Sequence, residues 1–502
     1  MDSRYLSCDT VYCLLNEVRT DVINEKRMST NAILNLIKQT CQIIFPLITF
    51  PYISRILGPE GYGEYSFSST IVNYFLLLSS FGISSYSIRE GAKIRNNGIL
   101  FNTFANQVFT INVLTMLVSY SAMVVLLTIN PKIQQYMVLI IIQSIAMFLN
   151  TVGADWINVV YEDYLYITVR YIVIQIVALF SIFMFVKSRE DVYKYCLISV
   201  LASNGGNIIN CFYIRRYTSL QLTMKPNFHK HFVSMLILFV NSIAITIYVN
   251  ADITMLGMYY SDEVVGVYSF SSKIYNLLKM MINAIVVVTV PKMAALVECD
   301  TNKYKNYIQS ISSGITIILL PVAIGLCCMS TSIITLAGGK QYQVGTSALR
   351  ILSVAMIPAI YASITTNCVL IASGKEKYCL KATIISALIN ISMNFIFIPY
   401  IGLCGAAITT VIAEIVNFGI QYYFAKKSAG SFFENRRLIA TCALGCVYIV
   451  IACLICNTFF VNEYEKLLAA VISSMVGYSI IMWIRERKVI FNIVKLFRES
   501  NM

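Results

Sequence analysis

Charged residues are scarce in this sequence. Asp, Glu, Lys and Arg together make up 13% of its 502 positions, while hydrophobic residues make up 58%. An average soluble domain carries about 25% charged residues. The apolar side chains therefore exceed what a soluble core of this length needs, and we expect lipid to be the solvent of most of the chain.

Long polar stretches are also missing after the first 30 residues. Apolar stretches of roughly 20 residues, the length of one helical bilayer crossing, recur from Asn31 almost to the C-terminus. Because the loops between them are short, the pattern argues against receptors, ATP-driven pumps and enzymes with a catalytic domain outside the membrane. We predict an all-α integral membrane protein with about 14 transmembrane helices. The predicted spans are 31–54, 66–88, 103–128, 133–153, 166–186, 192–214, 232–258, 271–291, 307–329, 346–372, 381–400, 403–424, 438–460 and 467–484.

Metal-ligand and disulfide patterns are absent as well. The 15 cysteines are scattered through apolar segments without metal-ligand spacing, and the two histidines share one basic stretch, HKH at 229–231. Small buried thiols are the simplest interpretation of such cysteines. We therefore predict neither a metal site nor a disulfide framework, and no cluster of catalytic residues, so that the protein moves a substrate rather than transforming it.

The net charge of +13 follows from the topology rather than from a nucleic-acid partner. Of the 38 Lys and Arg residues, 26 fall in the N-terminal segment, the C-terminal tail and every second loop, and 7 fall in the other loops. Positive loops face the cytoplasm, which predicts cytoplasmic termini. Residues 1–30 form a cytoplasmic segment in this scheme. Residues 485–502 form a basic amphipathic tail on the inner leaflet.

An internal repeat divides the chain. Residues 59–73 (PEGYGEYSFSSTIVN) and 262–276 (DEVVGVYSFSSKIYN) share nine identities. Each copy spans the loop after the first helix of a six-helix unit, which predicts an N-lobe at 31–214 and a C-lobe at 232–424. A helix pair at 438–484 follows. Six is even, so both lobes insert with the same orientation and should be related by a pseudo-two-fold axis along the membrane normal.

The stretch SRILGPEGYGEYSFSSTIVNYFLLLSSFGISSYSIREGAKIRNN, at 54–97, resembles the opening signature of the polysaccharide flippases. These proteins belong to the superfamily of the multidrug and toxic-compound extrusion (MATE) transporters. Further similar segments are ADWINVVYEDYLYITVR at 154–170, NADITMLGMYYSDEVVGVYSFSSKI at 250–274, GGKQY at 338–342 and ASGKEKY at 372–378.

The resemblance implies a MATE-like fold and a flippase for undecaprenyl-pyrophosphate-linked oligosaccharide repeat units. Such a protein works by alternating access, from the cytoplasmic to the periplasmic leaflet of the bacterial inner membrane, in O-antigen, capsule or exopolysaccharide assembly. The implied partners are the lipid-linked substrate, membrane lipids and other polysaccharide-assembly proteins, with one chain as the transport unit. No cofactor is implied beyond a coupling ion, either H⁺ or Na⁺.

A carrier of a pyrophosphate needs cations and hydrogen-bonding groups among its helices. A charge in mid-bilayer costs roughly 2.5 to 3.5 kcal/mol on insertion scales, so the basic residues inside the predicted spans are candidates for binding substrate. Lys38, Arg170 and Lys273 can alternatively snorkel to an interface, and Arg55 and Arg89 can serve as topological anchors. The predicted substrate ligands are Lys279, Arg350, Lys38, Lys273, Arg170, Asn276, Arg55 and Arg89.

Two carboxylates lie inside predicted helices, Asp252 in the seventh span and Glu414 in the twelfth. Either each pairs with a basic residue for structural reasons, or it binds the coupling cation; the sequence leaves both open.

Three alternatives remain at this stage. A multidrug exporter of the same superfamily should have a more acidic and apolar lumen. A lipid II flippase would share the fold. A polytopic glycosyltransferase or O-antigen polymerase should carry a catalytic cluster, generally with a large periplasmic loop, and the sequence shows neither.

Overall fold

The computed structural model describes residues 8–299, 301–430 and 436–499, and within these ranges every regular element is helical. The first part of the chain forms α1 (Cys8–Ser80), α2 (Ile83–Ile94), α3 (Gly98–Ile129), α4 (Pro131–Gln134), α5 (Met137–Gly153), α6 (Trp156–Val160), α7 (Tyr164–Phe185), α8 (Val192–Asn204) and α9 (Gly206–Tyr213). The second part forms α10 (Phe228–Tyr259), α11 (Asp262–Cys299), α12 (Thr301–Cys328), α13 (Ser330–Gly338), α14 (Thr346–Ile364), α15 (Glu376–Ala429), α16 (Arg436–Phe459) and α17 (Glu463–Glu499). Short 3₁₀ segments at Arg189–Asp191, Ile214–Arg216 and Lys340–Gly345 and a π-helix at Thr365–Ile371 join some of them.

Glycines break the longest helices. Gly58 in α1 and Gly402 in α15 have positive φ angles of 69° and 55°, a region that glycine enters without the steric cost of a Cβ. Each helix therefore bends into two arms. Gly82 (φ 70°) lies between α1 and α2 and is the N-cap of α2. The predicted span 66–88 is therefore divided between these two helices.

Eleven helices within the described residues are long and apolar enough to cross a membrane, and α5 is a shorter apolar helix. The all-α membrane fold is confirmed. The bent helices α1 and α15 each count once among the eleven, although each holds residues of two predicted spans. The number of fourteen crossings therefore stays a prediction.

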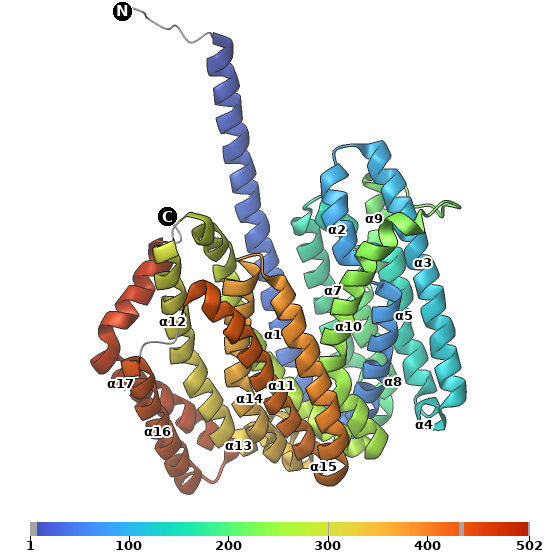
Figure 1. Cartoon of the computed structure of the whole chain (residues 1–502). Coiled ribbons are helices and arrows are strands. Elements are labelled where there is room, and N and C mark those ends of the chain that lie inside the picture. The colour runs from blue at the N-terminus through green and yellow to red at the C-terminus, as the bar shows by residue number, and fades with distance from the viewer. Residues whose placement is uncertain (1–7, 300, 431–435, 500–502) are drawn as a thin grey trace, which may run out of the picture.

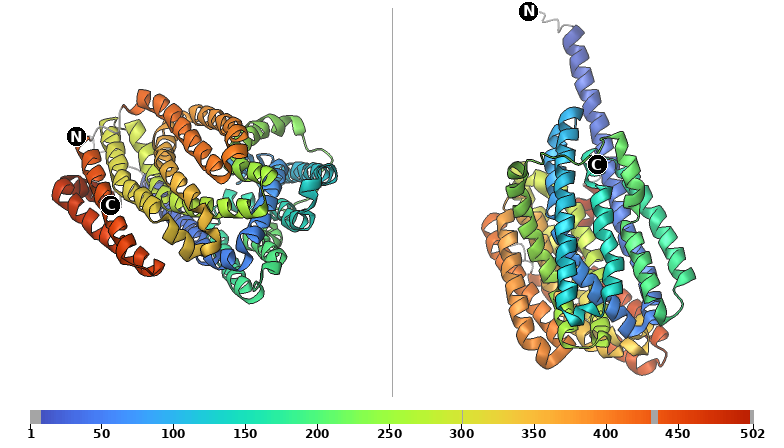
Figure 2. Two further views of the ribbon diagram at one scale, coloured as in Figure 1. Left: turned by 90° about the horizontal axis from the view of Figure 1, so that it is seen from below. Right: turned by 90° about the vertical axis from the view of Figure 1, so that its right-hand side faces the viewer.

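The helices form one bundle, and the predicted division into two lobes and a helix pair stays a prediction. We call residues 31–214 the N-half and residues 232–424 the C-half. Figure 1 shows α2, α3, α5, α7, α8 and α9 on one side and α11, α12, α14 and α15 on the other. Helix α10 packs against α1 and α2 and also against α15. Helices α16 and α17, in red, lie at the edge of the bundle (Figure 2).

The two copies of the internal repeat lie against each other. A Cβ atom added to Gly63 would lie 1.8 Å from the carbonyl oxygen of Asp262, and one added to Gly266 would lie 1.7 Å from that of Pro59. Gly63 and Gly266 are equivalent positions of the repeat, as are Pro59 and Asp262. Small residues let helix backbones approach closely in membranes, so α1 and α11 cross here in a reciprocal contact. The pseudo-two-fold relation between the lobes stays a prediction.

Hydrogen bonds between the halves surround this crossing. The Tyr136 hydroxyl donates to Asp262 Oδ1 over 2.6 Å, and the Tyr342 hydroxyl donates to the carbonyl oxygen of Ser54 over 3.1 Å. All four residues are far apart in sequence, so these bonds hold the two halves together at this end of the bundle.

The two chain ends are helical where they are described. The N-terminal part of α1 projects beyond the bundle (Figure 1), and α17 continues past a non-helical break at Glu486. Arg437 Nε and Thr441 Oγ1 bind the Glu486 carboxylate at 3.3 and 3.0 Å. Side chains 1–29 and 492–502 lie outside the described residues, so the cytoplasmic location of residues 1–30 and the inner-leaflet tail at 485–502 stay predictions.

Candidate functional site

Asp252 is the centre of a buried polar cluster in the C-half. Its carboxylate accepts hydrogen bonds from the Tyr268 hydroxyl at 2.6 Å, Thr410 Oγ1 at 2.6 Å, Asn394 Nδ2 at 2.7 Å and Asn390 Nδ2 at 3.4 Å. The bend of α15 folds its two arms together, which brings the asparagines of one arm and the threonine of the other to the same carboxylate. Asp252 is only 7% exposed, so these four donors replace water as its solvent.

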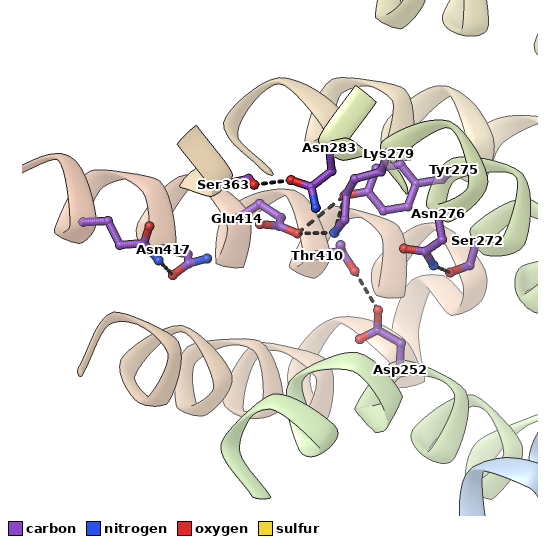
Figure 3. A network of polar contacts seen from close by, with 11 residues as sticks. Asp252, Ser272, Tyr275, Asn276, Lys279, Asn283, Ser363, Thr410, Glu414 and Asn417 are labelled. Carbon is purple, nitrogen blue, oxygen red and sulfur yellow. Dashed lines mark hydrogen bonds and ion pairs between the residues drawn. The ribbon is translucent and has the colours of Figure 1, made fainter. Parts of the chain in front are cut away.

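The second intramembrane carboxylate, Glu414, is already paired with a predicted substrate ligand. Lys279 Nζ on α11 lies 3.1 Å from Glu414 Oε1 on α15, and the Tyr275 hydroxyl lies 3.5 Å from the same oxygen. Thr410 and Glu414 are four residues apart and share one helix face, so this pair lies beside the Asp252 cluster (Figure 3). The Glu414 side chain is 5% exposed and that of Lys279 is 32% exposed.

Further polar pairs extend this line along the C-half. Ser363 on α14 donates to Asn283 Oδ1 on α11, and Gln421 Nε2 donates to Asn417 Oδ1 at 2.9 Å on α15. Figure 3 shows Ser363 and Asn283 beside the Lys279–Glu414 bridge, and Asn417 farther along α15. The C-half therefore contains a continuous polar region among α10, α11, α14 and α15.

A cationic cavity of about 180 Å³ lies in the N-half. It brings together two residues that were predicted as substrate ligands, Lys38 on α1 and Arg170 on α7. The other polar groups that we use come from α1, from the end of α5, from the following turn and from α9. The polar lining that we use below consists of Lys38, Gln42, Asn150, Asp155, Arg170 and Asn207.

Arg170 is held in this cavity by Asp155. Arg170 Nη2 lies 2.5 Å from Asp155 Oδ1, and the same oxygen accepts from Asn158 Nδ2 at 3.1 Å and Asn210 Nδ2 at 3.4 Å. Ala154 has a φ of +42°, an uncommon left-handed conformation for a residue with a Cβ, and it turns the chain directly before this aspartate. The Arg170 side chain is 9% exposed, and its Nη1 is buried without a hydrogen-bond partner among the described residues.

Lys38 has no ion-pair partner within the part of the chain that the structure describes. Its ammonium lies 6.0 Å from the centre of the Tyr171 ring. The cationic cavity thus holds two cations and one carboxylate, Asp155, and Arg170 uses that carboxylate. The excess is positive, as a binding site for an anion requires.

Two of the predicted ligands lie at helix ends and are engaged there. Arg55 donates to the backbone carbonyl oxygens of Leu336 and, at 3.3 Å, Ala337, so it joins α1 to α13. Arg89 on α2 is exposed and pairs with its neighbour Glu90 at 3.0 Å. Their binding of substrate stays a prediction, and so does the anchoring role considered for both.

Three other predicted ligands lie outside the cationic cavity. Lys273 is exposed on α11, and Asn276 on the same helix donates to Ser272 Oγ at 3.2 Å. Arg350 is exposed in the second turn of α14, where Nη2 donates to Thr331 Oγ1 at 3.3 Å. Their roles in binding substrate also stay predictions.

The comparisons with known proteins agree with the resemblance in the sequence. Residues 28–297 match the family model described as "Polysaccharide biosynthesis protein". The chain belongs to this family.

Relatives with curated names support the same assignment. The chain is 20% identical over 396 residues to a putative O-antigen transporter of Shigella dysenteriae, across 78% of this chain and 98% of the relative. It is 22% identical to the capsular polysaccharide biosynthesis protein CapF of Staphylococcus aureus, across 78% of this chain and 97% of the relative.

Solved structures confirm the MATE-like fold. The lipid II flippase MurJ in an inward closed conformation superimposes with a TM-score of 0.72 and 16% identity, across 93% of this chain and all of the other. An inward-facing MATE-family multidrug transporter superimposes with a TM-score of 0.57 and 14% identity, across 81% of this chain and 96% of the other. At such identities the likeness concerns the fold alone.

Within this family fold, sequence reasoning missed Asp155 as a partner of Arg170. Asp155 lies inside the segment at 154–170 that resembles the family, but its spacing from Arg170 has no helical periodicity because a turn and the short helix α6 intervene. The asparagines at 150 and 207 were missed for a simpler reason: amides at helix ends are common, and nothing in the sequence indicates that these two face one cavity.

Proposed function

We propose that this chain is a flippase for lipid-linked oligosaccharides. It carries an undecaprenyl-pyrophosphate-linked repeat unit from the cytoplasmic to the periplasmic leaflet of the bacterial inner membrane by alternating access, for O-antigen, capsule or exopolysaccharide assembly. The observation that carries the proposal is a cationic cavity enclosed by the helices of a chain of the polysaccharide biosynthesis family.

The pyrophosphate binds to Lys38 and Arg170 in this proposal. A guanidinium presents five donors in a fixed fork, and only some of those of Arg170 are used by Asp155, with Nη1 left without a partner among the described residues. Hydrogen bonds between ionised groups are roughly twice as strong as neutral ones. The prenyl tail is apolar and stays in lipid in this proposal.

The charge of the cavity favours this substrate over the organic cations of a multidrug exporter. Two cations face a single carboxylate there, and that carboxylate is bonded to Arg170. An organic cation would meet net repulsion. The fold that the chain shares with MurJ and the MATE transporters does not distinguish a polysaccharide repeat unit, lipid II and an organic cation. The charge of the cavity disfavours the organic cation, and the family match supports a polysaccharide repeat unit over lipid II.

We expect Arg170→Ala to reduce surface glycan at least tenfold in a strain that lacks its own O-unit flippase and depends on this protein. The loss follows from removing a charge-assisted hydrogen-bond donor, about 1.5 to 3 kcal/mol, from the pyrophosphate site. Lys38→Ala should act in the same direction. The matched control is Arg215→Ala, which removes an exposed arginine of the N-half that does not line the cavity, and all proteins are compared at equal amounts in the membrane.

The flippase proposal is wrong if the unaltered protein restores no surface glycan with any repeat unit tried and instead lowers drug accumulation. If glycan is restored but Arg170→Ala and Lys38→Ala match Arg215→Ala, the assignment of the pyrophosphate to the cationic cavity fails while the flippase activity stands.

Asp252 is the better of the two candidates for the coupling ion. Glu414 is engaged by Lys279, whereas the donors to Asp252 within the described part of the chain are all neutral. An isolated carboxylate among neutral groups within the membrane is costly when charged, so binding H⁺ or Na⁺ there is favourable. Release of that ion couples the energy of a gradient to movement of the halves.

We expect Asp252→Asn to lose gradient-driven transport while keeping a slow, gradient-independent rate. Asparagine has nearly the same shape and keeps one acceptor oxygen for Thr410 or Tyr268, but it cannot carry the charge. Flipping of a labelled lipid-linked saccharide in proteoliposomes, with an imposed proton or sodium gradient, measures this. Glu263→Gln serves as the control carboxylate, because Glu263 is exposed at the start of α11. A variant that still responds to either gradient as the unaltered protein does would contradict the assignment.

A further inference from the structure

A second cavity of about 250 Å³ adjoins the cationic cavity in the N-half. Hydroxyl and amide groups dominate its polar lining, together with the Trp156 side chain, and no Lys or Arg among the described residues contributes to it. We call it the hydroxyl cavity. Its polar lining consists of Ser79, Ser80, Ser84, Asn112, Asn150, Thr151, Asp155 and Asn207.

The two cavities share a wall. Asn150, Asp155 and Asn207 line both of them, and Asn207 Nδ2 donates to Asn150 Oδ1 at 2.9 Å across that wall. Asp155 is the anchor of Arg170. A ligand that enters both cavities would therefore place an anionic part beside Arg170 and an uncharged part among the serines.

The hydroxyl cavity contains a buried acceptor without a partner. Asn112 lies in the middle of α3 and is 9% exposed, and its Oδ1 makes no hydrogen bond within the described part of the chain. A buried polar atom that is left unsatisfied costs about 1 to 3 kcal/mol, and such atoms in native structures call for an explanation. A ligand that donates a hydroxyl or an amide N–H to Asn112 Oδ1 supplies one.

We propose that the hydroxyl cavity is the subsite for the sugar bonded directly to the pyrophosphate of the lipid-linked substrate. This inference rests on the proposed function, because it takes the pyrophosphate to be in the cationic cavity. In a glycosyl pyrophosphate the first sugar is attached to the phosphate itself, so its subsite has to adjoin the phosphate site. The shared wall of Asn150, Asp155 and Asn207 meets that requirement.

The chemistry of the lining fits an uncharged sugar ring. A sugar presents hydroxyls that both donate and accept, and the serine and threonine hydroxyls can do the same. The Trp156 side chain adds an apolar surface of the kind that packs against the carbon face of a ring. An anionic sugar finds no cation in this cavity, which predicts a preference for a neutral first sugar.

The volume of the hydroxyl cavity limits the size of the ligand that it can hold. Pockets for drug-sized ligands have roughly 300 to 1,000 Å³, and the hydroxyl cavity is smaller than that range. It accommodates one ring rather than a whole repeat unit. The remaining sugars must extend out of the cavity, so this subsite discriminates among repeat units by their first sugar and tolerates differences farther along.

Two water-soluble probes with short prenyl chains test the subsite on the purified full-length protein in lipid nanodiscs. One is a short-chain prenyl pyrophosphate, and the other is the same compound carrying one N-acetylhexosamine. We expect the sugar-bearing probe to bind at least tenfold more tightly to the unaltered protein. Asn112→Leu should remove most of that difference and leave the affinity for the sugar-free probe unchanged.

Asn204→Leu is the matched control, because Asn204 is also in the N-half, on α8, but lines neither cavity. Asn112→Leu removes the unsatisfied oxygen, so its thermal midpoint should not fall below that of the control. Equal affinity of the two probes for the unaltered protein, or an equal loss for both probes in Asn112→Leu, would overturn the subsite.

Other outcomes would contradict the proposed function rather than the sugar subsite. If neither probe binds, or if Arg170→Ala leaves the binding of both unchanged, the pyrophosphate is not in the cationic cavity. The two assignments can also be separated. If Arg170→Ala still binds the sugar-bearing probe more tightly and Asn112→Leu does not, the sugar subsite is supported independently of the assignment of the pyrophosphate to the cationic cavity.

Discussion

Gly266→Ala is expected to abolish transport and to separate α1 from α11. The new Cβ would lie 1.7 Å from the carbonyl oxygen of Pro59 and 3.0 Å from the backbone nitrogen of Gly63. Backbone atoms cannot move aside as a flexible side chain can. Overpacking of a tight core typically costs about 1 to 3 kcal/mol, occasionally more. The cost should lie at the upper end here, because the atoms that the new Cβ would meet are main-chain atoms.

Gly63→Ala should have the same effect, because its Cβ would lie 1.8 Å from the carbonyl oxygen of Asp262. Both substitutions act on one helix crossing, so their effects should not add in the double variant. Hydrogen exchange of the backbone amides in 59–73 and 262–276 measures the separation. An increase confined to these two segments indicates that the halves part, whereas an increase throughout the chain indicates general unfolding.

Gly61→Ala is the matched control. It lies two residues from Gly63, and its Cβ would make ordinary contacts at 3.5 Å or more. Alanine is favoured over glycine inside a helix by about 0.8 to 1 kcal/mol, so this variant should be at least as stable as the unaltered protein and should transport normally. If Gly63→Ala and Gly266→Ala behave as Gly61→Ala does, the close crossing of the two repeats does not exist in the membrane.

Lys279→Met is expected to destabilise the protein more than Glu414→Gln does. Breaking a buried ion pair by removing one partner leaves the other charge without compensation, at a cost of about 3 to 5 kcal/mol when both are buried. The Glu414 side chain is 5% exposed, but that of Lys279 is 32% exposed. Loss of the lysine strands a carboxylate that protein encloses, whereas loss of the carboxylate strands an ammonium that protein encloses only partly, on a long side chain that can move towards water.

The double variant Lys279→Met/Glu414→Gln should recover most of the stability that Lys279→Met loses, because neither charge is then stranded. Thermal unfolding in detergent, with the four proteins compared as a double-mutant cycle, gives the coupling between the two residues. Equal midpoints for both single variants would show that burial does not set the cost. Transport by the double variant then tests Lys279 as a predicted substrate ligand: full activity would exclude it.

The family and the helical membrane fold could be predicted from the sequence because their signals are local. A run of apolar residues long enough to span a bilayer is one continuous segment, and the motif at 54–97 is another. The repeat could also be found by comparing the two segments directly. The breaks at Gly58, Gly82 and Gly402 were harder, because a glycine in an apolar run is compatible with a straight helix as well as with a bend.

The sequence by itself therefore determined that lipid surrounds most of this protein, and it determined the helical class and the family. It also indicated which charged residues lie within membrane-spanning segments, where a charge is costly. Only the tertiary structure decided which of these charges meet. Lys279 and Glu414 are 135 residues apart, and Asp252 and Asn394 are 142 residues apart. Helical periodicity says which residues share a face, but not which helix that face packs against. The scarce charges of the chain acquire distinct environments only through that packing: Lys279 is neutralised by a carboxylate, while Lys38 and Arg170 share one cavity.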